Sequence, residues 1–295
     1  MRLRTRLDAM PRECRDSRRR LTVFCIAAVL GLAAGMGKAM PGEPAPPRGA
    51  EILARLKAAY PSFVTGLDGN TLVFAGGSSL PLDDGAGEKP IEAWLAKPDI
   101  EDMFRLAYPA GAPATAPAKD FDPGRARNDA FFSKIYGDCR AGGVAKNLID
   151  VTWLPKKSGE TLRVTKINGV APQLQAVSDE LDALPARFNP FLYPSAGTFN
   201  CRPIAGTKSL SAHGYGIAID IAVKNAHYWR WAKGGPEGVV TYENTMPLEI
   251  VSVFEKHGFI WGGRWSHYDT MHFEYRPELL PPPETGPTSD QEAPR

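Results

Sequence analysis

One acidic residue inside an apolar, β-branched segment constrains the fold of this chain more than any other feature. Residues 216–223 read GIAIDIAV, a pattern typical of a buried strand, and Asp220 stands in its middle. An ionised carboxylate is costly to bury unless an opposite charge or a metal ion compensates it. The fold must therefore bring such a partner to Asp220 from elsewhere in the chain.

Strand alternation indicates where the partner comes from. The branched residues of this strand share one face, and Asp220 shares the other face with two alanines that leave open space beside the carboxylate. A second predicted strand, MHFEYR at residues 271–276, carries His272 and Glu274 on one face. If the two strands are neighbours in a sheet, Asp220 and His272 converge.

A second histidine, His213, precedes Asp220 by seven residues. Two imidazoles and one carboxylate, with a fourth position open, are typical of a catalytic zinc site, where zinc polarises a carbonyl and lowers the pKa of water. Such chemistry needs a base, and Asp269, three residues before His272, is our candidate, with Glu274 as the alternative. The competing interpretation is a capped loop histidine and a buried Asp220 that bonds to backbone groups.

These residues fall into two motifs, SAHGYGIAID and GFIWGGRW followed by DTMHFEY, which resemble the zinc D-alanyl-D-alanine peptidase family. This family includes vancomycin-resistance-type D,D-carboxypeptidases, D,D-dipeptidases and L-alanyl-D-glutamate endopeptidases. Its signature is Ser-x-His-x-x-Gly-x-Ala-x-Asp, followed by an acidic residue three positions before a histidine. The matching residues are Ser211, His213, Gly216, Ala218, Asp220, Asp269 and His272. The resemblance covers roughly residues 200–274.

The resemblance implies a hedgehog-like zinc peptidase fold and hydrolysis of an amide bond in peptidoglycan stem peptides. It implies zinc (Zn2+) on His213, Asp220 and His272, with Asp269 as general base. It also implies an upstream arginine that stabilises the oxyanion, for which Arg202 is the candidate. The alternative function is a zinc-stabilised, non-catalytic cell-wall-binding or interaction domain.

Two departures from the family pattern leave the cleaved bond open between carboxypeptidase and endopeptidase types. The stretch between the arginine and the first motif is often longer in the family, and Arg264 follows WGG where the endopeptidase branch commonly has Asp. Around the site, we expect Ser211 to hydrogen-bond to the backbone or to a metal ligand, and Trp261 to lie in the pocket wall. We expect His267 at the rim, because an odd offset places it on the opposite strand face from His272.

The chain begins with a segment typical of export. Residues 1–39 combine a basic start, an apolar run over residues 21–36 and a small-residue ending, which predicts a secretory signal peptide or, if uncleaved, an N-terminal anchor. This segment carries a net charge of +6 within a chain of +2, so the remainder carries −4. A mildly acidic remainder without a basic stripe argues against nucleic acid as a partner. We expect a periplasmic or cell-envelope protein that meets the membrane only through this segment.

Cysteine usage agrees with export. With residues 1–39 set aside, Cys139 and Cys201 remain as one pair. Two cysteines in an exported protein favour a disulfide over a metal site, and two separate buried thiols are the alternative.

The remaining pattern mixes helices and strands without a regular βαβ rhythm, which predicts an α+β fold with a small antiparallel sheet flanked by helices. The predicted helices span residues 50–60, 91–108, 171–184 and 243–259, the last capped by Asn244 or Thr245. The predicted extended segments are a hairpin over 71–85, strands within 147–155 and 161–169, and residues 191–201. The predicted organisation is a linker over 40–48, an N-terminal helix and hairpin subdomain over 49–127, a catalytic domain over 128–280 and a disordered tail over 281–295.

Overall fold

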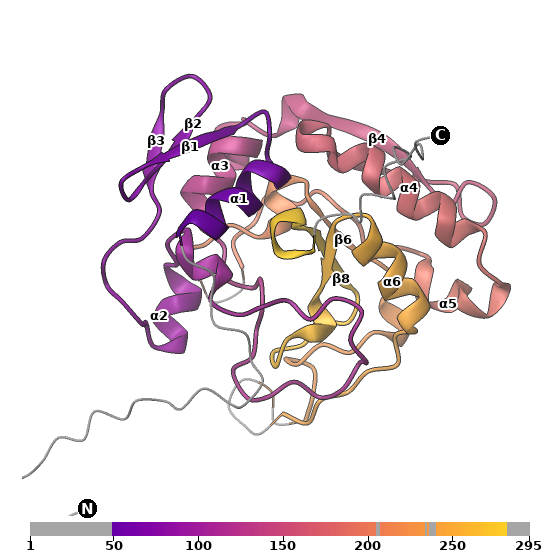
Figure 1. Ribbon diagram of the computed structural model, residues 1–295. Coiled ribbons are helices and arrows are strands. Elements are labelled where there is room, and N and C mark those ends of the chain that lie inside the picture. Colours follow the sequence, from indigo (N-terminus) through magenta and orange to yellow (C-terminus); the bar gives the residue numbers. More distant parts are fainter. Residues whose placement is uncertain (1–48, 205–206, 234, 236–239, 282–295) are drawn as a thin grey trace, which may run out of the picture. The chain divides into compact units, whose positions relative to one another are not determined.

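The computed structural model describes residues 49–204, 207–233, 235 and 240–281 (Figure 1). The predicted signal peptide or anchor, the predicted linker and all of the predicted tail except residue 281 lie outside the described residues. All described residues belong to one compact unit. In the part of the chain that the structure describes, no helix is long and apolar enough to cross a membrane.

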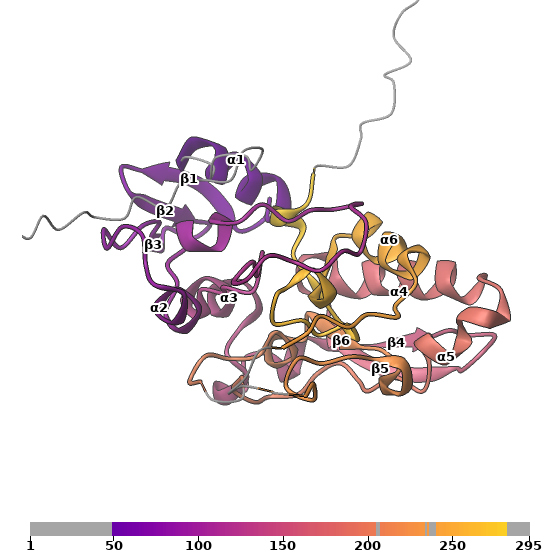
Figure 2. The same ribbon diagram turned by 90° about the horizontal axis from the view of Figure 1, so that it is seen from below.

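The described residues form an α+β structure with small antiparallel sheets, which confirms the predicted fold class (Figures 1 and 2). The α-helices are α1 (Gly49–Ala59), α2 (Ile91–Ala96), α3 (Asp129–Tyr136), α4 (Val170–Asp182), α5 (Asn189–Leu192) and α6 (Leu248–Lys256). The strands are β1 (Val64–Asp68), β2 (Thr71–Phe74), β3 (Ser79–Pro81), β4 (Leu148–Trp153), β5 (Glu160–Thr165), β6 (Ala218–Asp220), β7 (Phe259–Trp261) and β8 (His272–Tyr275).

The sheet that carries the candidate site has the strand order β6-β8-β7, with both pairs antiparallel. Asp220 and His272 are direct partners across β6 and β8, so the two strands are the neighbours that the convergence requires. Strand β6 is shorter than the predicted 216–223, because the chain leaves the ladder after Asp220 and forms a 3-10 turn at Val223–Asn225.

Helices cover this part of the molecule on one side. Helix α4 packs on β4 and β5, and α6 packs on β7 and α4. The ring of Phe254 on α6 stacks on Phe273 of β8 with centroids 3.8 Å apart. Helix α6 therefore fixes β8 from its apolar side and leaves His272 free to face the site.

The N-terminal segment shares the same hydrophobic core. Helix α1 packs on β1 and on the 3-10 helix Pro277–Leu279, and the Tyr60 hydroxyl donates a 2.7 Å hydrogen bond to Glu278. Buried side chains from α1 through Leu280 form one continuous cluster. The predicted subdomain boundary after residue 127 stays a prediction.

Three predicted elements differ from the structure at their ends. The predicted helix over residues 91–108 is broken, because Lys97 precedes Pro98 and takes an extended φ of −149°, so α2 ends and a separate 3-10 helix forms at Glu101–Phe104. The predicted caps of α6 are wrong: Pro247 occupies the cap position, and no side chain caps the helix. The segment 191–201 is not extended throughout, because its first two residues belong to α5.

One helix was missed by the sequence analysis. Helix α3 begins after Asn128, whose Oδ1 accepts a hydrogen bond from the Phe131 amide at 2.8 Å. Gly137 ends the helix with a φ of +93°, where a Cβ would lie 2.8 Å from the Gly143 backbone. The cap and this glycine are both local signals that the sequence carried.

Candidate active site

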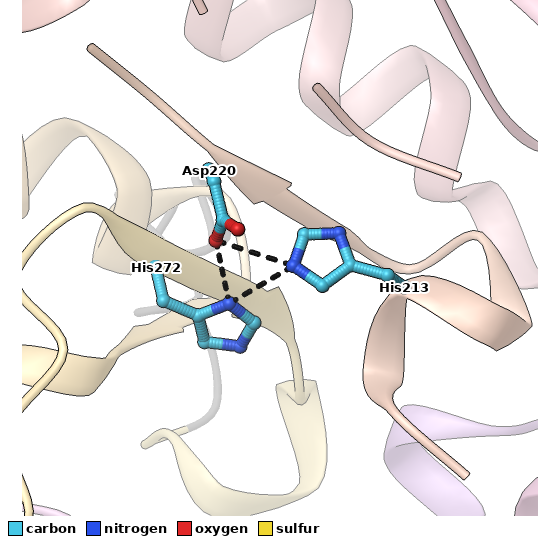
Figure 3. Close-up of side chains that lie close together, drawn as sticks. All are labelled: His213, Asp220 and His272. Carbon is cyan, nitrogen blue, oxygen red and sulfur yellow. Dashed lines mark hydrogen bonds and ion pairs between the residues drawn. The ribbon is translucent and has the colours of Figure 1, made fainter. Parts of the chain in front are cut away.

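Three side chains from separate segments meet at one point (Figure 3). Asp220 Oδ1 lies 2.8 Å from His272 Nδ1 and 3.2 Å from His213 Nε2, and the two imidazole nitrogens lie 3.2 Å apart. Asp220 comes from β6, His272 from β8, and His213 from the 3-10 helix Ala212–Tyr215. One nitrogen of each imidazole and one carboxylate oxygen are thus within 4.8 Å of one another, close enough to share a metal ion.

The outer nitrogen of each imidazole is also held. His213 Nδ1 lies 2.5 Å from the carbonyl oxygen of Thr198, and His272 Nε2 lies 3.1 Å from Glu274 Oε2. A partner on the outer nitrogen fixes the orientation of the ring and raises the basicity of the inner one, as at known metal sites. Two such histidines and a carboxylate fit the donor set that zinc takes in catalytic sites.

Glu274 stands behind His272 and is fully buried. It accepts hydrogen bonds from Arg127, through Nε and Nη2, and from Arg276 Nη1 at 3.0 Å. Burial alone raises its pKa, but the charges of Arg127 and Arg276 with the bond to His272 hold that pKa well below its usual range. Glu274 therefore orients His272 and does not serve as the alternative base, because its oxygens are occupied and it does not line the cleft.

The site is electrostatically balanced around His272. Burial lowers the pKa of this histidine, yet its bonds to Asp220 and Glu274 raise it to about 10. For the Asp220 carboxylate, burial acts in the opposite direction and raises the pKa. The charges and hydrogen bonds of His213 and His272 outweigh burial and hold this pKa far below its ordinary value. A proton on His272 Nδ1, which faces Asp220, takes the place that a metal cation would occupy, so metal binding would release it.

A cleft opens beside the three residues. Its lining comprises Arg125, Arg127, Arg202, Ile204, Ser211, His213, Asp220, Tyr228, Trp229, Trp265, His267, Asp269 and His272. Asp269 Oδ1 is buried and has no hydrogen-bond partner among the described residues. Burial raises the pKa of Asp269 to about 6, with Asp220 adding to the rise and His272 opposing it. A carboxylate with this pKa and a free oxygen can exchange a proton near neutral pH.

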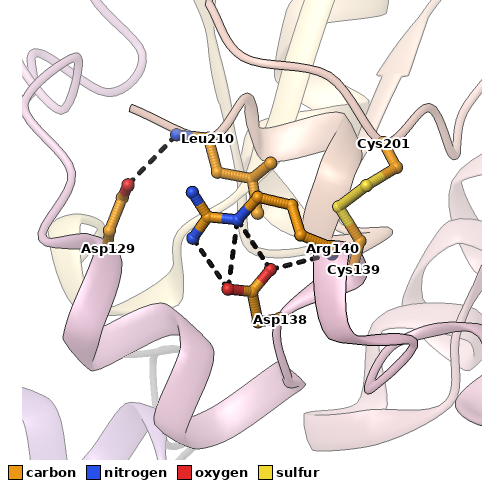
Figure 4. The surroundings of a disulfide bond; sticks show 6 residues. All are labelled: Asp129, Asp138, Cys139, Arg140, Cys201 and Leu210. Atoms are coloured by element: carbon orange, nitrogen blue, oxygen red, sulfur yellow. Dashed lines mark hydrogen bonds and ion pairs between the residues drawn. A yellow bond between two sulfur atoms is a disulfide. The ribbon is translucent and has the colours of Figure 1, made fainter. Parts of the chain in front are cut away.

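The predicted Arg202 and Ser211 also line the cleft, and a disulfide holds the segment that carries Arg202 (Figure 4). Cys139 and Cys201 are bonded, with Cα atoms 5.8 Å apart, which confirms the predicted pair and excludes two free thiols. The Ser211 amide donates to the Arg202 carbonyl oxygen at 3.1 Å. Arg202 is therefore anchored on both sides while its side chain stays exposed.

Trp261 does not form the cleft wall as predicted. It is fully buried, and its Nε1 donates to the carbonyl oxygen of Thr270 at 2.9 Å. Trp229 and Trp265 occupy the wall instead. The rim position predicted for His267 agrees with the structure, because it lines the cleft and does not belong to the three-residue cluster.

Residues 122–127, DPGRAR, also contribute to this cleft, and no sequence pattern predicted it. Arg125 and Arg127 line it, and Asp122 supports it from below through a 2.6 Å contact to His267 Nδ1. The segment reads as a loop before α3, and its only local signal is the alternation of Arg with small residues.

A second acidic group, formed by Asp83, Asp84 and Asp99, also has oxygens close together. Lys89 Nζ lies 2.9 Å from both Asp84 and Asp99 and 2.5 Å from Asp102. The lysine ammonium group already compensates these carboxylates. Of the two clusters found in the described residues, only the one in the cleft has histidine ligands and an open side.

Residues 205–275 match the family described as D-alanyl-D-alanine carboxypeptidase. The predicted resemblance is confirmed. The matched segment contains His213, Asp220, Asp269 and His272, and it ends with β8. No curated protein and no solved structure gave a match to the chain. The family match supports a peptidase acting on peptidoglycan-related substrates.

Proposed function

We propose that this protein is an exported zinc metallopeptidase that hydrolyses an amide bond in peptidoglycan stem peptides. The observation that carries the proposal is the buried oxygen of Asp269, which has no hydrogen-bond partner among the described residues and lies in the same cleft as His213, Asp220 and His272. A purely structural metal site has no use for such a carboxylate. The family match over residues 205–275 supports the same conclusion.

In the proposed reaction, His213 Nε2, Asp220 Oδ1 and His272 Nδ1 would hold the zinc ion. When bound, zinc would polarise the scissile carbonyl and lower the pKa of a water molecule. Asp269 accepts the proton of the attacking water and then delivers it to the leaving amine, a role open to a carboxylate that lines the same cleft. Arg202 donates hydrogen bonds to the oxyanion that forms on the carbonyl oxygen.

We also propose that the protein is exported and that its catalytic domain follows a separate N-terminal subdomain. Stem peptides lie outside the cytoplasmic membrane, so residues 1–39 would serve as the export signal or anchor and the disulfide would form in an oxidising compartment. Residues 128–280 would form the catalytic domain with a hedgehog-like arrangement, preceded by the subdomain over residues 49–127.

Digestion of purified sacculi by the zinc-loaded protein tests the function. Product masses separate the two activities: free D-alanine indicates a carboxypeptidase, whereas cleaved L-alanyl-D-glutamate bonds indicate an endopeptidase. Asp269→Asn should lose at least 100-fold in rate while it retains zinc, since general-base catalysis contributes roughly 10²–10⁴-fold. Asp84→Asn, a change at an exposed carboxylate outside the cleft, is the matched control.

Absence of any new product from zinc-loaded protein would contradict the enzymatic proposal. If the wild type releases no product but binds zinc and sacculi, and Asp269→Asn binds both equally well, the protein would be a binding module instead.

A further inference from the structure

Three arginines line the cleft, and they differ in how far the protein already uses them. The donors of Arg127 already have protein partners. Nε and Nη2 donate to Glu274, and Nη1 donates to the carbonyl oxygen of Arg125 at 3.1 Å. Arg202 is exposed and has its proposed task at the oxyanion. Within the described part of the chain, the guanidinium of Arg125 has fewer hydrogen-bond partners than it can take, and Arg125 has no assigned role.

The guanidinium of Arg125 is largely removed from solvent but poorly paired. Its side chain is 19% exposed and makes one side-chain hydrogen bond among the described residues, from Nη1 to Asp122 Oδ2 at 3.3 Å. Its central carbon lies 5.9 Å from the ring of Trp229 and 6.0 Å from that of Trp265. Burial lowers the pKa of Arg125, and the charge of Asp122 only partly offsets this. The remaining N–H groups form a donor fork on a desolvated cation, which favours an anionic ligand.

Asp122 holds this arginine in place but does not satisfy it. The carboxylate is fully buried and also accepts hydrogen bonds from the His267 amide at 3.0 Å and from Ser266 Oγ at 3.2 Å. Its shortest contact, 2.6 Å, is to His267 Nδ1 through the same oxygen that Arg125 shares. Asp122 therefore shares its carboxylate among Arg125, Ser266 and His267, and the guanidinium of Arg125 stays available to a ligand in the cleft.

We propose that Arg125 binds a carboxylate of the substrate beside the scissile bond and that Asp122 is its positioning residue. A planar guanidinium fork matches a carboxylate through two parallel hydrogen bonds, which an ammonium group cannot reproduce. The inference rests on the proposed function and deepens it, because it defines the substrates as peptides with a free carboxylate near the cleaved bond. That carboxylate belongs either to the C-terminal residue or to the glutamyl residue of the stem peptide.

Amidated peptides distinguish these sources. The substrates are a stem pentapeptide ending in D-alanyl-D-alanine, its C-terminal amide, and the same peptide with the glutamyl α-carboxylate amidated. One of the two amidations should reduce kcat/KM of the zinc-loaded wild type by roughly 10–100-fold, the range for a charged hydrogen-bonded pair. The same amidation should change kcat/KM of Arg125→Gln less than about threefold. The amidation that lowers kcat/KM of the wild type identifies the carboxylate that Arg125 binds.

Further variants separate recognition from folding. Arg125→Lys keeps the charge but loses the fork, so its discrimination should be intermediate. Asp122→Asn should lose discrimination chiefly through KM, whereas a merely structural defect would lower kcat for all three peptides alike. Arg55→Gln, at an exposed arginine of α1 that pairs with Glu51, should discriminate as wild type does.

The proposal is overturned if Arg125→Gln keeps the full discrimination or if neither amidation affects the wild type. Calorimetric Kd values for the same three peptides make this test independent of turnover. If the wild type cleaves no peptide, the proposed function fails. Carboxylate recognition by Arg125 would then still be supported by a Kd ratio that the variant loses, and refuted by equal Kd values.

Discussion

Replacement of Glu274 by glutamine tests whether the buried carboxylate both stabilises the fold and orients a metal ligand. Glu274 and Arg276 are fully buried and Arg127 is 7% exposed. Arg276 keeps Glu278 as a partner at 2.5 Å, so the charge left without compensation in Glu274→Gln is that of Arg127.

Removal of one partner from a buried ion pair costs about 3–5 kcal/mol, and the remaining partner of Arg276 favours the lower end, about 3 kcal/mol. For a domain of this size that corresponds to a fall in Tm of about 6–12 °C. Loss of the charged acceptor of His272 Nε2 should also weaken zinc binding by roughly 10–100-fold.

The stability assay is denaturant unfolding of the metal-free protein at neutral pH, followed by tryptophan fluorescence, and zinc affinity is measured by competition with a chelator. Glu51→Gln is the matched control: its carboxylate is 54% exposed and pairs with the exposed Arg55, so its loss should cost under about 1 kcal/mol. Folding lowers the pKa of Glu274 from its ordinary value of 4.5, so its stabilisation is complete above that value. The difference in unfolding free energy between wild type and Glu274→Gln should therefore narrow only as the pH falls below about 4.5.

A Glu274→Gln protein that unfolds within about 1 kcal/mol of wild type and binds zinc equally well would refute the reasoning. Loss of stability with unchanged zinc affinity would refute only the orienting role of Glu274.

The remaining predictions concern the ligands, the base and the disulfide. Asp220→Ala should abolish zinc binding measured by metal analysis, and retention of one zinc per chain would contradict the ligand assignment. Burial raises the pKa of Asp269 and the charge of a bound metal cation would lower it, so peptidase activity should fall on the acid side as the Asp269 carboxylate becomes protonated. An acid limb of the pH profile that stays the same in Asp269→Glu would contradict this. The Cys139–Cys201 bond closes a separation of 62 residues, so Cys139→Ser with Cys201→Ser should lose about 4 kcal/mol of unfolding free energy. The same pair should lower kcat by freeing Arg202, and an unaltered kcat would exclude that anchoring role.

Much of the candidate site follows from local sequence. Alternation along 216–223 and 271–276 puts Asp220 and His272 on defined strand faces, and the structure pairs them directly. Helix α4 and the β4–β5 hairpin were likewise predictable, because each depends on periodicity and turn residues within a short window. Two predicted helix boundaries were wrong for reasons that are also local. Pro98 breaks the helical pattern over 91–108, and Pro247 takes the cap position expected for Asn244 or Thr245.

The surroundings of the site depended on contacts between distant residues. Arg127 reaches Glu274 across 147 positions, and Asp122 reaches His267 across 145. Nothing in the period of a strand or the spacing of a motif says which loop will close over a sheet, because that choice depends on the packing of whole elements. Local sequence patterns therefore predicted the convergence of His213, Asp220 and His272 and the disulfide pair. Which charges surround these residues depends on the packing of distant segments, because buried ions must find their partners wherever the packed fold supplies them.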